Sequence, residues 1–238
     1  ALFSLRKMAE GGVRDHLGGG FCRYSVDAQW AIPHFEKMLY DNAQLAMIYL
    51  RAARIFKNPA YRDVAIETLD FMLEEMRAES AFVTSTSALD GQGREGGAYL
   101  WSEVQLKAML EPDEYALLAG LWGMDSPAEF ELGYLPVRRK EPAAGEQKRL
   151  QAIYARLKQA RKERVIPRDI KLLAGLNGLA LLALSEAAEI VPRYRQAADQ
   201  LHDFMRHSLW QKGILHKGMS NRQLLGQGDL ESYAYTVA

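Results

Sequence analysis

The sequence lacks several features that would narrow its function. Cys22 is the single cysteine among 238 residues, so the chain can form neither an internal disulfide framework nor a zinc site built from several cysteines. The 30 basic residues balance the 30 acidic ones, and a formal net charge of zero disfavours a protein devoted to binding nucleic-acid backbones. The remaining composition, 48% hydrophobic and 25% charged, is that of an ordinary globular protein and indicates no particular function.

Targeting and membrane signals are also missing. Residues 1–8 do not show the basic, apolar and small-residue succession of a secretory signal. The longest apolar stretch, residues 172–184, is interrupted by two glycines and an asparagine and is too short to cross a bilayer. We therefore expect a cytoplasmic protein without a membrane partner. The chain starts without an initiator Met and ends abruptly, which predicts a stretch cut from a longer protein.

Helical periodicity dominates the chain and predicts an all-α fold. A long helix is expected from Pro33 to Phe56, because proline suits the first helical position, where its missing N–H costs nothing. A partner helix is expected from Tyr61 to Arg77. Strand signal is confined to residues 81–84 and 97–101, which predict at most a short β-hairpin. Further helices are expected at 2–10, 102–110, 111–122, 146–164, 172–189, 193–210 and from 230 onward.

An internal repeat is the most informative feature of the sequence. Asn42 followed by Pro59 recurs as Asn177 followed by Pro192, at offsets of 135 and 133 residues. A helix–turn–helix unit that returns in this way predicts stacked αα-hairpins, because one hairpin cannot bury its apolar face alone. In each hairpin the first helix is apolar on nearly all sides and the second is charged on one face, which predicts an inner and an outer layer of helices. Chance similarity between two amphipathic hairpins is the alternative.

Residues 18–30 form the first candidate binding segment. Three glycines at 18–20 permit positive φ or close approach of the backbone to a ligand. Arginine and aromatic side chains near a carboxylate suit a polar, hydroxylated small molecule, and a structural loop pinned by an Arg–Asp pair is the alternative. The candidate substrate-binding residues of this segment are Arg23, Tyr24, Asp27 and Trp30.

A polar stripe marks the first half of the predicted helix that follows. Such a stripe on an otherwise apolar inner helix is costly unless it lines a wet cavity, and a buried, mutually satisfied polar network is the alternative. A lone histidine without a second ligand at metal spacing is a poor zinc candidate, so we expect no metal and no cofactor. Helical spacing places His34, Lys37, Asp41 and Gln44 on one face, and Glu36 and Tyr40 on an adjacent face.

Weaker candidates lie further along the chain. The Gly-rich loop 88–97 holds Asp90 and Glu95, and it has no Gly-Lys-Ser/Thr ending of a phosphate-binding loop. A surface turn is the alternative reading of this loop. Two aromatic residues follow it, and polar residues stand at two further starts of predicted helices. These additional candidates are Tyr99, Trp101, Asn177, Glu231 and Tyr233.

Charge is segregated along the chain despite the zero total. Residues 63–131 carry a net charge of −12, and residues 138–168 carry +8. A basic stretch of this kind suits a nucleic acid or an anionic surface. An ordinary apolar stripe within the same stretch favours a solvated outer helix instead.

Two neighbouring motifs resemble the signature of a known family. Residues 18–27 (GGGFCRYSVD) and 33–45 (PHFEKMLYDNAQL) are similar to thioredoxin-domain-containing proteins of the spermatogenesis-associated protein 20 type, and residues 87–90, 99–101 and 177–179 match later blocks in order. The resemblance implies an α/α toroid of the six-hairpin barrel type, similar to sugar 2-epimerases and many glycosidases. Residues 1–238 would then form a single, incomplete α/α-barrel domain, with a thioredoxin-like domain as a partner in related proteins.

Two functional hypotheses follow from the residues and the resemblance. The first is a carbohydrate-active barrel that takes a small saccharide, either an epimerase or isomerase with His34 as acid/base or a glycosidase with two flanking carboxyls. The second is a non-catalytic ligand- or protein-binding barrel. Departures from the family pattern favour it, at Cys22, residues 91–94, Ile170, Leu176 and Ser232. Neither involves nucleic acid. The candidate catalytic residues are His34, Glu36, Asp41, Asp90 and Glu231, and the candidate substrate-binding residues are Arg23, Tyr24, Asp27, Trp30, Lys37, Tyr40, Tyr99, Trp101, Asn177 and Tyr233.

Overall fold

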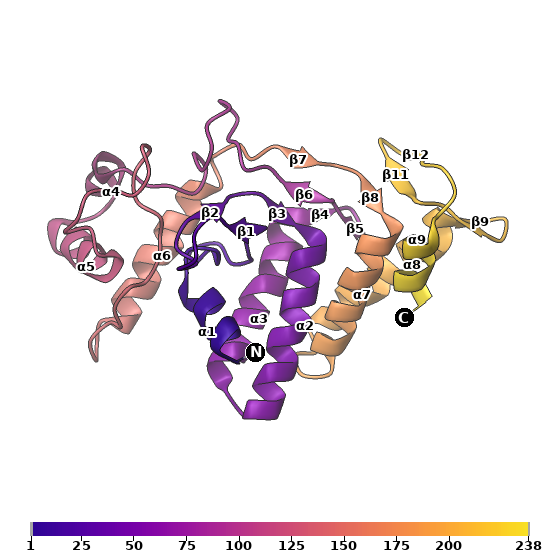
Figure 1. Ribbon diagram of the computed structural model, residues 1–238, viewed down its shortest axis with the longest axis horizontal. Helices are drawn as coiled ribbons and strands as arrows, with labels where there is room; N and C mark the ends of the chain where they lie inside the picture. Colours follow the sequence, from indigo (N-terminus) through magenta and orange to yellow (C-terminus); the bar gives the residue numbers. More distant parts are fainter. Residues whose placement is uncertain (1, 238) are drawn as a thin grey trace. The chain divides into compact units, whose positions relative to one another are not determined.

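Helices account for about half of residues 2–237, which are the residues that the computed structural model describes (Figure 1). The chain divides into two compact units. Unit 1 comprises Ala1–Gly18, Cys22–Glu36 and Ser87–Pro167, and unit 2 comprises Gly19–Phe21, Lys37–Thr86 and Arg168–Ala238. The single α/α-barrel domain expected over residues 1–238 stays a prediction, since this division concerns compactness and not independent folding. No helix within residues 2–237 is both long and apolar enough to cross a membrane.

Unit 2 contains the repeat that the sequence predicts. Two αα-hairpins return with the same succession of elements, since each second helix continues into a π-helical turn and then a β-hairpin. The first copy is α2 (Leu39–Phe56), α3 (Pro59–Phe71), η1 (Met72–Met76), β4 (Arg77–Ala78) and β5 (Ala81–Phe82). The second is α7 (Ala174–Ala188), α8 (Tyr194–Phe204), η2 (Met205–Leu209), β9 (Trp210–Gln211) and β10 (Ile214–Leu215).

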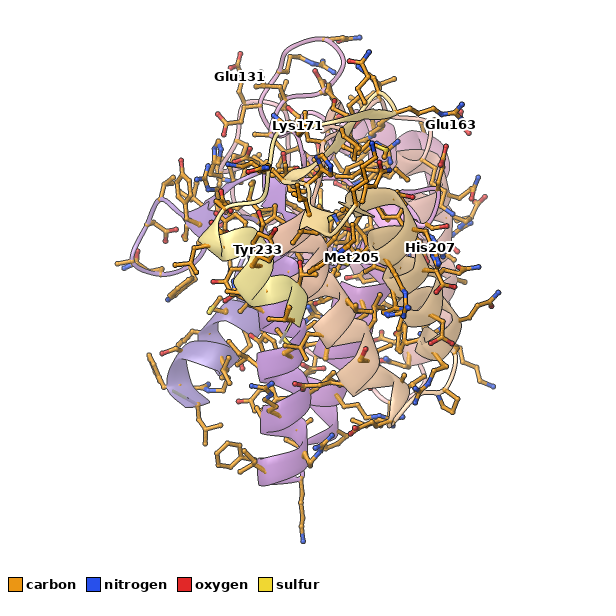
Figure 2. All side chains as sticks on the ribbon, turned by 90° about the vertical axis from the view of Figure 1, so that its right-hand side faces the viewer. Glu131, Glu163, Lys171, Met205, His207 and Tyr233 are labelled. Carbon is orange, nitrogen blue, oxygen red and sulfur yellow. The ribbon has the colours of Figure 1, made fainter. Side chains whose placement is uncertain are left out.

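The two hairpins of unit 2 pack through their first helices, α2 and α7. Their second helices are joined by side chains, because Arg193 at the start of α8 bonds both carboxylate oxygens of Asp70 on α3, at 2.8 and 2.7 Å. The Tyr194 hydroxyl donates to the same carboxylate at 2.9 Å. A further helix, α9 (Leu230–Val237), packs against α7 (Figure 2). The described part of unit 2 is therefore layered as the two hairpin patterns predict.

A buried asparagine stands in the first turn of each first helix. The Asn42 amide accepts a hydrogen bond from the Phe21 N–H at 2.7 Å and donates to the Phe21 carbonyl at 3.1 Å. Asn177 makes the same pair of bonds with Phe82, at 2.8 and 3.0 Å. Both side chains are fully buried. Each asparagine therefore satisfies both backbone groups of a residue that has no partner in a longer sheet.

Short strands are more numerous than the single hairpin expected from the sequence. In unit 2, β3 (Lys37–Met38), β6 (Ser85–Thr86) and β7 (Arg168–Asp169) form one antiparallel sheet. A second sheet joins β8 (Leu172–Leu173), β11 (Gly218–Ser220) and β12 (Gln223–Leu224). Each strand has only two or three residues, so none carries a readable alternation of side chains. These strands therefore form because they pair with segments far away in the sequence, and not because of a local pattern.

The helix expected from Pro33 begins at Leu39 instead. Residues 33–34 form β2 and residues 37–38 form β3, so this stretch is extended. Proline has no backbone N–H to donate, and it is tolerated in an edge strand as well as at a helix start. The single helical face expected for His34, Lys37, Asp41 and Gln44 is therefore wrong, since only Asp41 and Gln44 lie on the helix.

The described part of unit 1 combines four helices with one strand pair. Its elements are α1 (Leu2–Glu10), β1 (Tyr24–Ser25), β2 (Pro33–His34), α4 (Glu103–Met109), α5 (Pro112–Trp122) and α6 (Gln147–Arg161). A core of large apolar side chains joins α4, α5 and α6, with Trp101 and Trp122 almost completely buried in it. The strand expected at residues 97–101 is absent, and only Trp101 forms an isolated bridge, to Tyr134.

A buried ion pair ties the N-terminal part of unit 1 to α6. Arg161 is 3% exposed and donates to the Asp15 carboxylate at 2.5 Å. The other oxygen of Asp15 accepts from the N–H groups of Leu17 and Gly18, at 3.0 and 2.8 Å. A Cβ atom on Gly18 would lie 1.5 Å from the Arg161 guanidinium. A side chain at position 18 would therefore displace this guanidinium from its ion pair with Asp15.

Candidate functional site

The candidate site of unit 1 begins with a pair of rings on adjacent strands. β1 and β2 are antiparallel, and their register places Tyr24 directly opposite His34. The two rings stack with centroids 4.8 Å apart and planes 16° from parallel. Such directly opposed side chains form the unit of contact between antiparallel strands. Tyr24 is 48% exposed, so the outer side of this pair is open to a ligand.

The loop between these strands is organised by Asp27. Its carboxylate accepts hydrogen bonds from the Ser25 hydroxyl at 2.7 Å and from the N–H groups of Gln29, Ala31 and Ile32 at 3.0, 3.0 and 2.7 Å. Burial alone would raise the pKa of Asp27, but these bonds outweigh it and lower the pKa. Both carboxylate oxygens of Asp27 accept hydrogen bonds from the loop itself, so Asp27 has a structural role in place of the expected substrate-binding one.

Trp30 lies at the tip of the same loop and is half-buried. Its backbone adopts a positive φ of 62°, which is unusual for a bulky residue. The Trp30 carbonyl accepts from the Gly12 N–H at 2.7 Å. This residue therefore anchors the loop to the turn after α1, and its binding role stays a prediction.

His34 lies between two carboxylates. Its Nδ1 is 3.0 Å from Glu95 Oε1, and its Nε2 is 3.9 Å from Glu36 Oε2. Glu36 in turn accepts a hydrogen bond from Arg23 at 3.0 Å, and the Arg23 N–H donates to the Glu36 carbonyl at 2.8 Å. The His34 and Glu36 side chains are 27% and 25% exposed. Arg23, Tyr24, His34 and Glu36 thus lie together in this structure, and Glu95 joins them.

Glu95 reaches this cluster because of how its loop is built. Asp90 accepts from the N–H groups of Gln92 and Arg94, both at 2.9 Å, and from the Arg94 guanidinium at 2.9 and 2.7 Å. These bonds from Arg94, foremost from its backbone, hold the pKa of Asp90 below its ordinary value. Asp90 is 7% exposed and shapes the loop, and Glu95 is the residue of this loop that contacts His34.

Packing of the adjacent residues fixes the approach of Glu95 to His34. Phe35 follows His34, and Gly96 follows Glu95. A Cβ atom on Gly96, whose φ is +71°, would lie 2.6 Å from the Phe35 ring. The absence of that atom lets the loop pack directly on Phe35. Sequence reasoning singled out this loop without choosing Glu95, because nothing local distinguishes it from Asp90.

The contact with Glu95 decides the protonation pattern of the His34 ring. An ionised carboxylate only accepts hydrogen bonds, so the Nδ1 atom must donate the proton in that contact. In the neutral ring the lone pair then lies on Nε2. The distance of 3.9 Å from Nε2 to Glu36 is too long for a hydrogen bond. The geometry therefore presents a basic nitrogen that a carboxylate orients from the opposite side of the ring.

Two aromatic residues expected to stack on a substrate are buried instead. Tyr99 and Trp101 are 2% and 1% exposed. Phe35 stacks on Tyr99 with centroids 5.5 Å apart. The Arg164 guanidinium lies 3.8 Å from the Trp101 ring centroid. The expectation that these rings bind sugar is therefore wrong, because the core of unit 1 covers their faces.

Unit 2 uses three of the expected binding residues for its own structure. Lys37 is fully buried, donates to the Gly19 carbonyl at 2.8 Å and lies 4.2 Å from the Phe71 ring centroid. Asn177 is fully buried in its contact with Phe82. The Tyr233 hydroxyl accepts from the Leu215 N–H at 3.2 Å. Neither Lys37 nor Asn177 is accessible to a substrate, so these two expectations are corrected.

The remaining candidates of unit 2 stand at helix starts. Tyr40 and Asp41 are half-buried in the first turn of α2, and Glu231 is exposed in the first turn of α9. Their convergence with the His34 cluster stays a prediction. Within residues 2–237, no group of three or more His, Cys, Asp or Glu side chains is placed to hold a metal ion.

Comparison with known proteins confirms the resemblance over about half of the chain. Over 116 residues, 46% of this chain, the sequence is 41% identical to spermatogenesis-associated protein 20 of Rattus norvegicus. The matched stretch is 15% of the rat protein, so the chain spans a small part of that relative. No protein-family model matches the sequence.

Solved structures show a looser similarity. A D-mannose isomerase aligns over 92% of this chain and 55% of its own, with a TM-score of 0.34 and 13% sequence identity. The cellobiose 2-epimerase of Spirochaeta thermophila aligns over 91% of this chain and 54% of its own, with a TM-score of 0.30 and 17% identity. Scores this low define neither a common fold nor a common function.

Proposed function

We propose that the His34 cluster binds a small saccharide and transfers a proton in an epimerase or isomerase reaction. The observation that carries this proposal is the 3.0 Å contact between His34 Nδ1 and Glu95, which leaves the Nε2 lone pair available on a partly exposed ring. A histidine oriented by a carboxylate is a common general base. Proton transfer at carbon is the step that epimerases and ketose–aldose isomerases share.

The chemistry assigns a part to each residue of the cluster. His34 Nε2 accepts the proton from the carbon next to the sugar carbonyl, and Glu95 stabilises the imidazolium that results. Return of this proton from Nε2 to the neighbouring carbon, with transfer of the hydroxyl proton to the carbonyl oxygen, gives the isomer. Delivery of a proton from water to the opposite face gives the epimer, and His34 then releases its proton to solvent. The Arg23–Glu36 pair offers a fixed donor and acceptor to sugar hydroxyls, and the exposed Tyr24 ring offers an apolar face.

Hydrolysis is less well supported than proton transfer. A glycosidase needs one carboxyl that donates a proton to the leaving oxygen. In unit 1, Asp90 has a lowered pKa through its bonds to Arg94, which keeps it ionised and unable to donate. Glu36 is bound to Arg23. The histidine is therefore the better proton carrier in this cluster.

The proposal extends to the architecture and the context of the chain. The two hairpins of unit 2, α2–α3 and α7–α8, support an α/α toroid built from helical hairpins. A cytoplasmic location and a thioredoxin-like domain in related proteins belong to the same proposal. Limited proteolysis, which would release separate fragments from a chain of independent domains, tests the single-domain part of it.

Solvent exchange tests the proposed reaction directly. The protein is incubated in D₂O with aldoses, ketoses and cellobiose, and incorporation of deuterium next to the carbonyl is followed by NMR. General acid–base catalysis contributes about 10²–10⁴-fold, so His34→Ala should slow exchange by at least about a hundredfold. Glu95→Gln should slow it less, because it removes only the orienting charge. His207→Ala is the matched control, since this exposed ring on η2 (Figure 2) bonds the Asp203 carbonyl of α8 and does not belong to the His34 cluster.

Binding without turnover is the second candidate function. The Arg23–Glu36 ion pair favours it, because this pair can hold sugar hydroxyls without any proton transfer. In that case calorimetry detects saccharide binding that Arg23→Ala weakens, while no deuterium is incorporated. Absence of both binding and exchange with every sugar rejects the site.

A further inference from the structure

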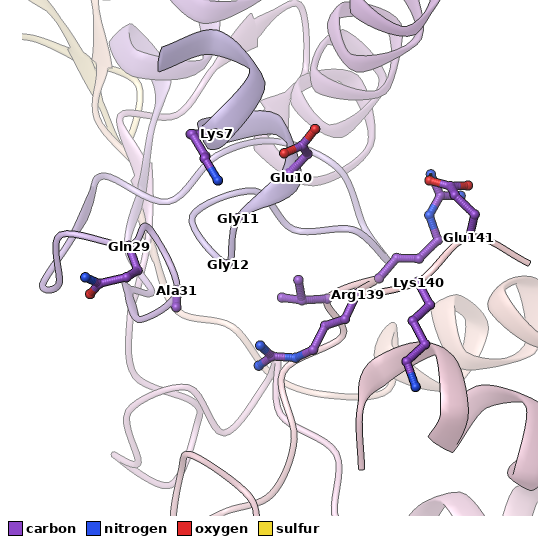
Figure 3. Close-up of a pocket in the computed structure, with 11 residues that line it drawn as sticks. Lys7, Glu10, Gly11, Gly12, Gln29, Ala31, Arg139, Lys140 and Glu141 are labelled. Atoms are coloured by element: carbon purple, nitrogen blue, oxygen red, sulfur yellow. The ribbon is translucent and has the colours of Figure 1, made fainter. Parts of the chain in front are cut away.

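A cavity of about 420 Å³ lies in unit 1 and shares no lining residue with the His34 cluster. Its volume is in the range of small-molecule sites. Lys7, Glu10 and the turn Gly11–Gly12 line one side, at the end of α1 (Figure 3). Gln29 and Ala31 come from the loop between β1 and β2, and residues 137–141 close the cavity. We call this space the basic cavity.

Close packing of backbone shapes one wall of the basic cavity. A Cβ atom on Gly12 would lie 2.0 Å from the Ala31 carbonyl oxygen, and one on Gly11 would lie 2.5 Å from the Trp30 carbonyl oxygen. The Asp27 carboxylate holds that same loop through the Ala31 N–H. The turn and the loop are thus fixed against each other by contacts that any larger residue at 11 or 12 would break.

Positive charge dominates the lining of the basic cavity. Four cationic side chains and two carboxylates face it, and both carboxylates already have cationic neighbours. Glu10 lies 3.7 Å from Arg6, and Glu141 lies 3.6 Å from Arg138. Within the described chain, neither Lys7 nor Lys140 has a carboxylate oxygen within 4.0 Å. The lining therefore carries an excess of two positive charges, with two ammonium groups unneutralised.

His16 lies beside the basic cavity. Its Nε2 lies 3.0 Å from the carbonyl oxygen of Gly11, which lines the basic cavity. Burial, together with the positive charges of Arg14 and Arg138, lowers the pKa of His16 to about 3, against opposing effects of the Gly11 carbonyl and Asp15. Two cationic side chains therefore act on His16 beside this cavity, in addition to the larger effect of burial.

We propose that the basic cavity binds the phosphate group of a small phosphorylated molecule. The dianion of a phosphate monoester matches the excess of two positive charges. Lysine ammonium and arginine guanidinium groups are the side chains that bind phosphate oxygens most strongly. The volume exceeds what a phosphate group fills, so the organic part of the ligand occupies the rest. The proposal also explains part of the basic stretch in the sequence, because Arg138–Lys140 are its first three residues.

Calorimetric titration with inorganic phosphate, at constant ionic strength, tests this proposal on the full chain. We expect saturable binding, weakened at least about tenfold in the Lys7→Gln/Lys140→Gln double variant, because two charge-assisted contacts are removed. Lys148→Gln is the matched control, since Lys148 is an exposed lysine on α6 outside the cavity. Its affinity should equal that of the unaltered protein.

A gain of affinity makes the test independent of misfolding. Glu10→Gln removes a negative charge from the lining, and it should tighten phosphate binding several-fold. His34→Ala should leave phosphate binding unchanged, so failure of this proposal is distinguishable from failure of the saccharide site. Absence of saturable binding, equal affinity in the double variant, or equal competition by acetate would each overturn the assignment to phosphate.

Discussion

The asparagines that open α2 and α7 allow a quantitative test of the repeat. Asn42→Ala removes both partners of Phe21, and Asn177→Ala removes both partners of Phe82. A buried backbone group left unpaired costs about 1–3 kcal/mol, so the two groups together cost about 4 kcal/mol. The third bond, to the carbonyl four residues earlier, adds little, because that carbonyl also accepts the first bond of the helix.

The expected loss corresponds to a fall of about 10 °C in melting temperature, since 1 kcal/mol shifts a chain of this size by about 2–4 °C. Urea unfolding followed by circular dichroism measures the loss in free energy of unfolding. Gln44→Ala and Ser185→Ala are matched controls on the exposed faces of the same helices, and each should change stability by less than about 0.5 kcal/mol. Losses below about 1 kcal/mol for both asparagines, or a large loss for only one, would refute the reasoning.

Two further predictions concern charge in unit 1. Asp15→Asn removes the carboxylate that faces the buried Arg161, and we expect it to lower the free energy of unfolding by about 3–5 kcal/mol. Glu10→Gln, at an exposed ion pair, should change this free energy by less than about 0.5 kcal/mol. Equal losses for the two variants in urea unfolding would contradict the importance of burial. Because the pKa of His16 is lowered in the folded protein, the neutral ring contributes fully to the free energy of unfolding above pH 6.5. This contribution is lost as the pH falls toward 3. His16→Gln should therefore flatten the decline of melting temperature between pH 6.5 and about pH 4, and an unchanged decline would count against the lowered pKa.

Periodicity located helices better than it located their starts. The expected helices at 2–10, 111–122 and 172–189 agree with α1, α5 and α7 to within two residues. The helix expected from Pro33 failed at its beginning, because β2 pairs with β1 and β3 pairs with β6, a segment almost fifty residues further along the chain. At residues 33–38, hydrogen bonds with distant backbone segments therefore outweigh the local preference for a helix start.

The fate of the polar and aromatic candidates depended on partners that no local pattern reveals. Lys37 looked like a site residue and is buried under its contacts with Gly19 and Phe71. Trp101 looked like a sugar platform and is covered by Arg164, 63 positions away. Glu95 and Asp90 looked equivalent in the sequence. In the structure, Asp90 holds the turn through the Arg94 N–H, whereas Glu95 contacts His34.

By itself, the sequence determined the helical character, the recurrence of one hairpin at a spacing of 135 residues, and the candidate segment from Arg23 to Glu36. These properties depend on apolar spacing and on residue types, which are local. The tertiary structure alone decided that His34 faces Glu95, that Asn42 and Asn177 bind backbone, and that four cations surround one cavity. These outcomes depend on contacts between segments far apart in the chain, where burial and hydrogen-bond geometry select one partner among many of similar chemistry.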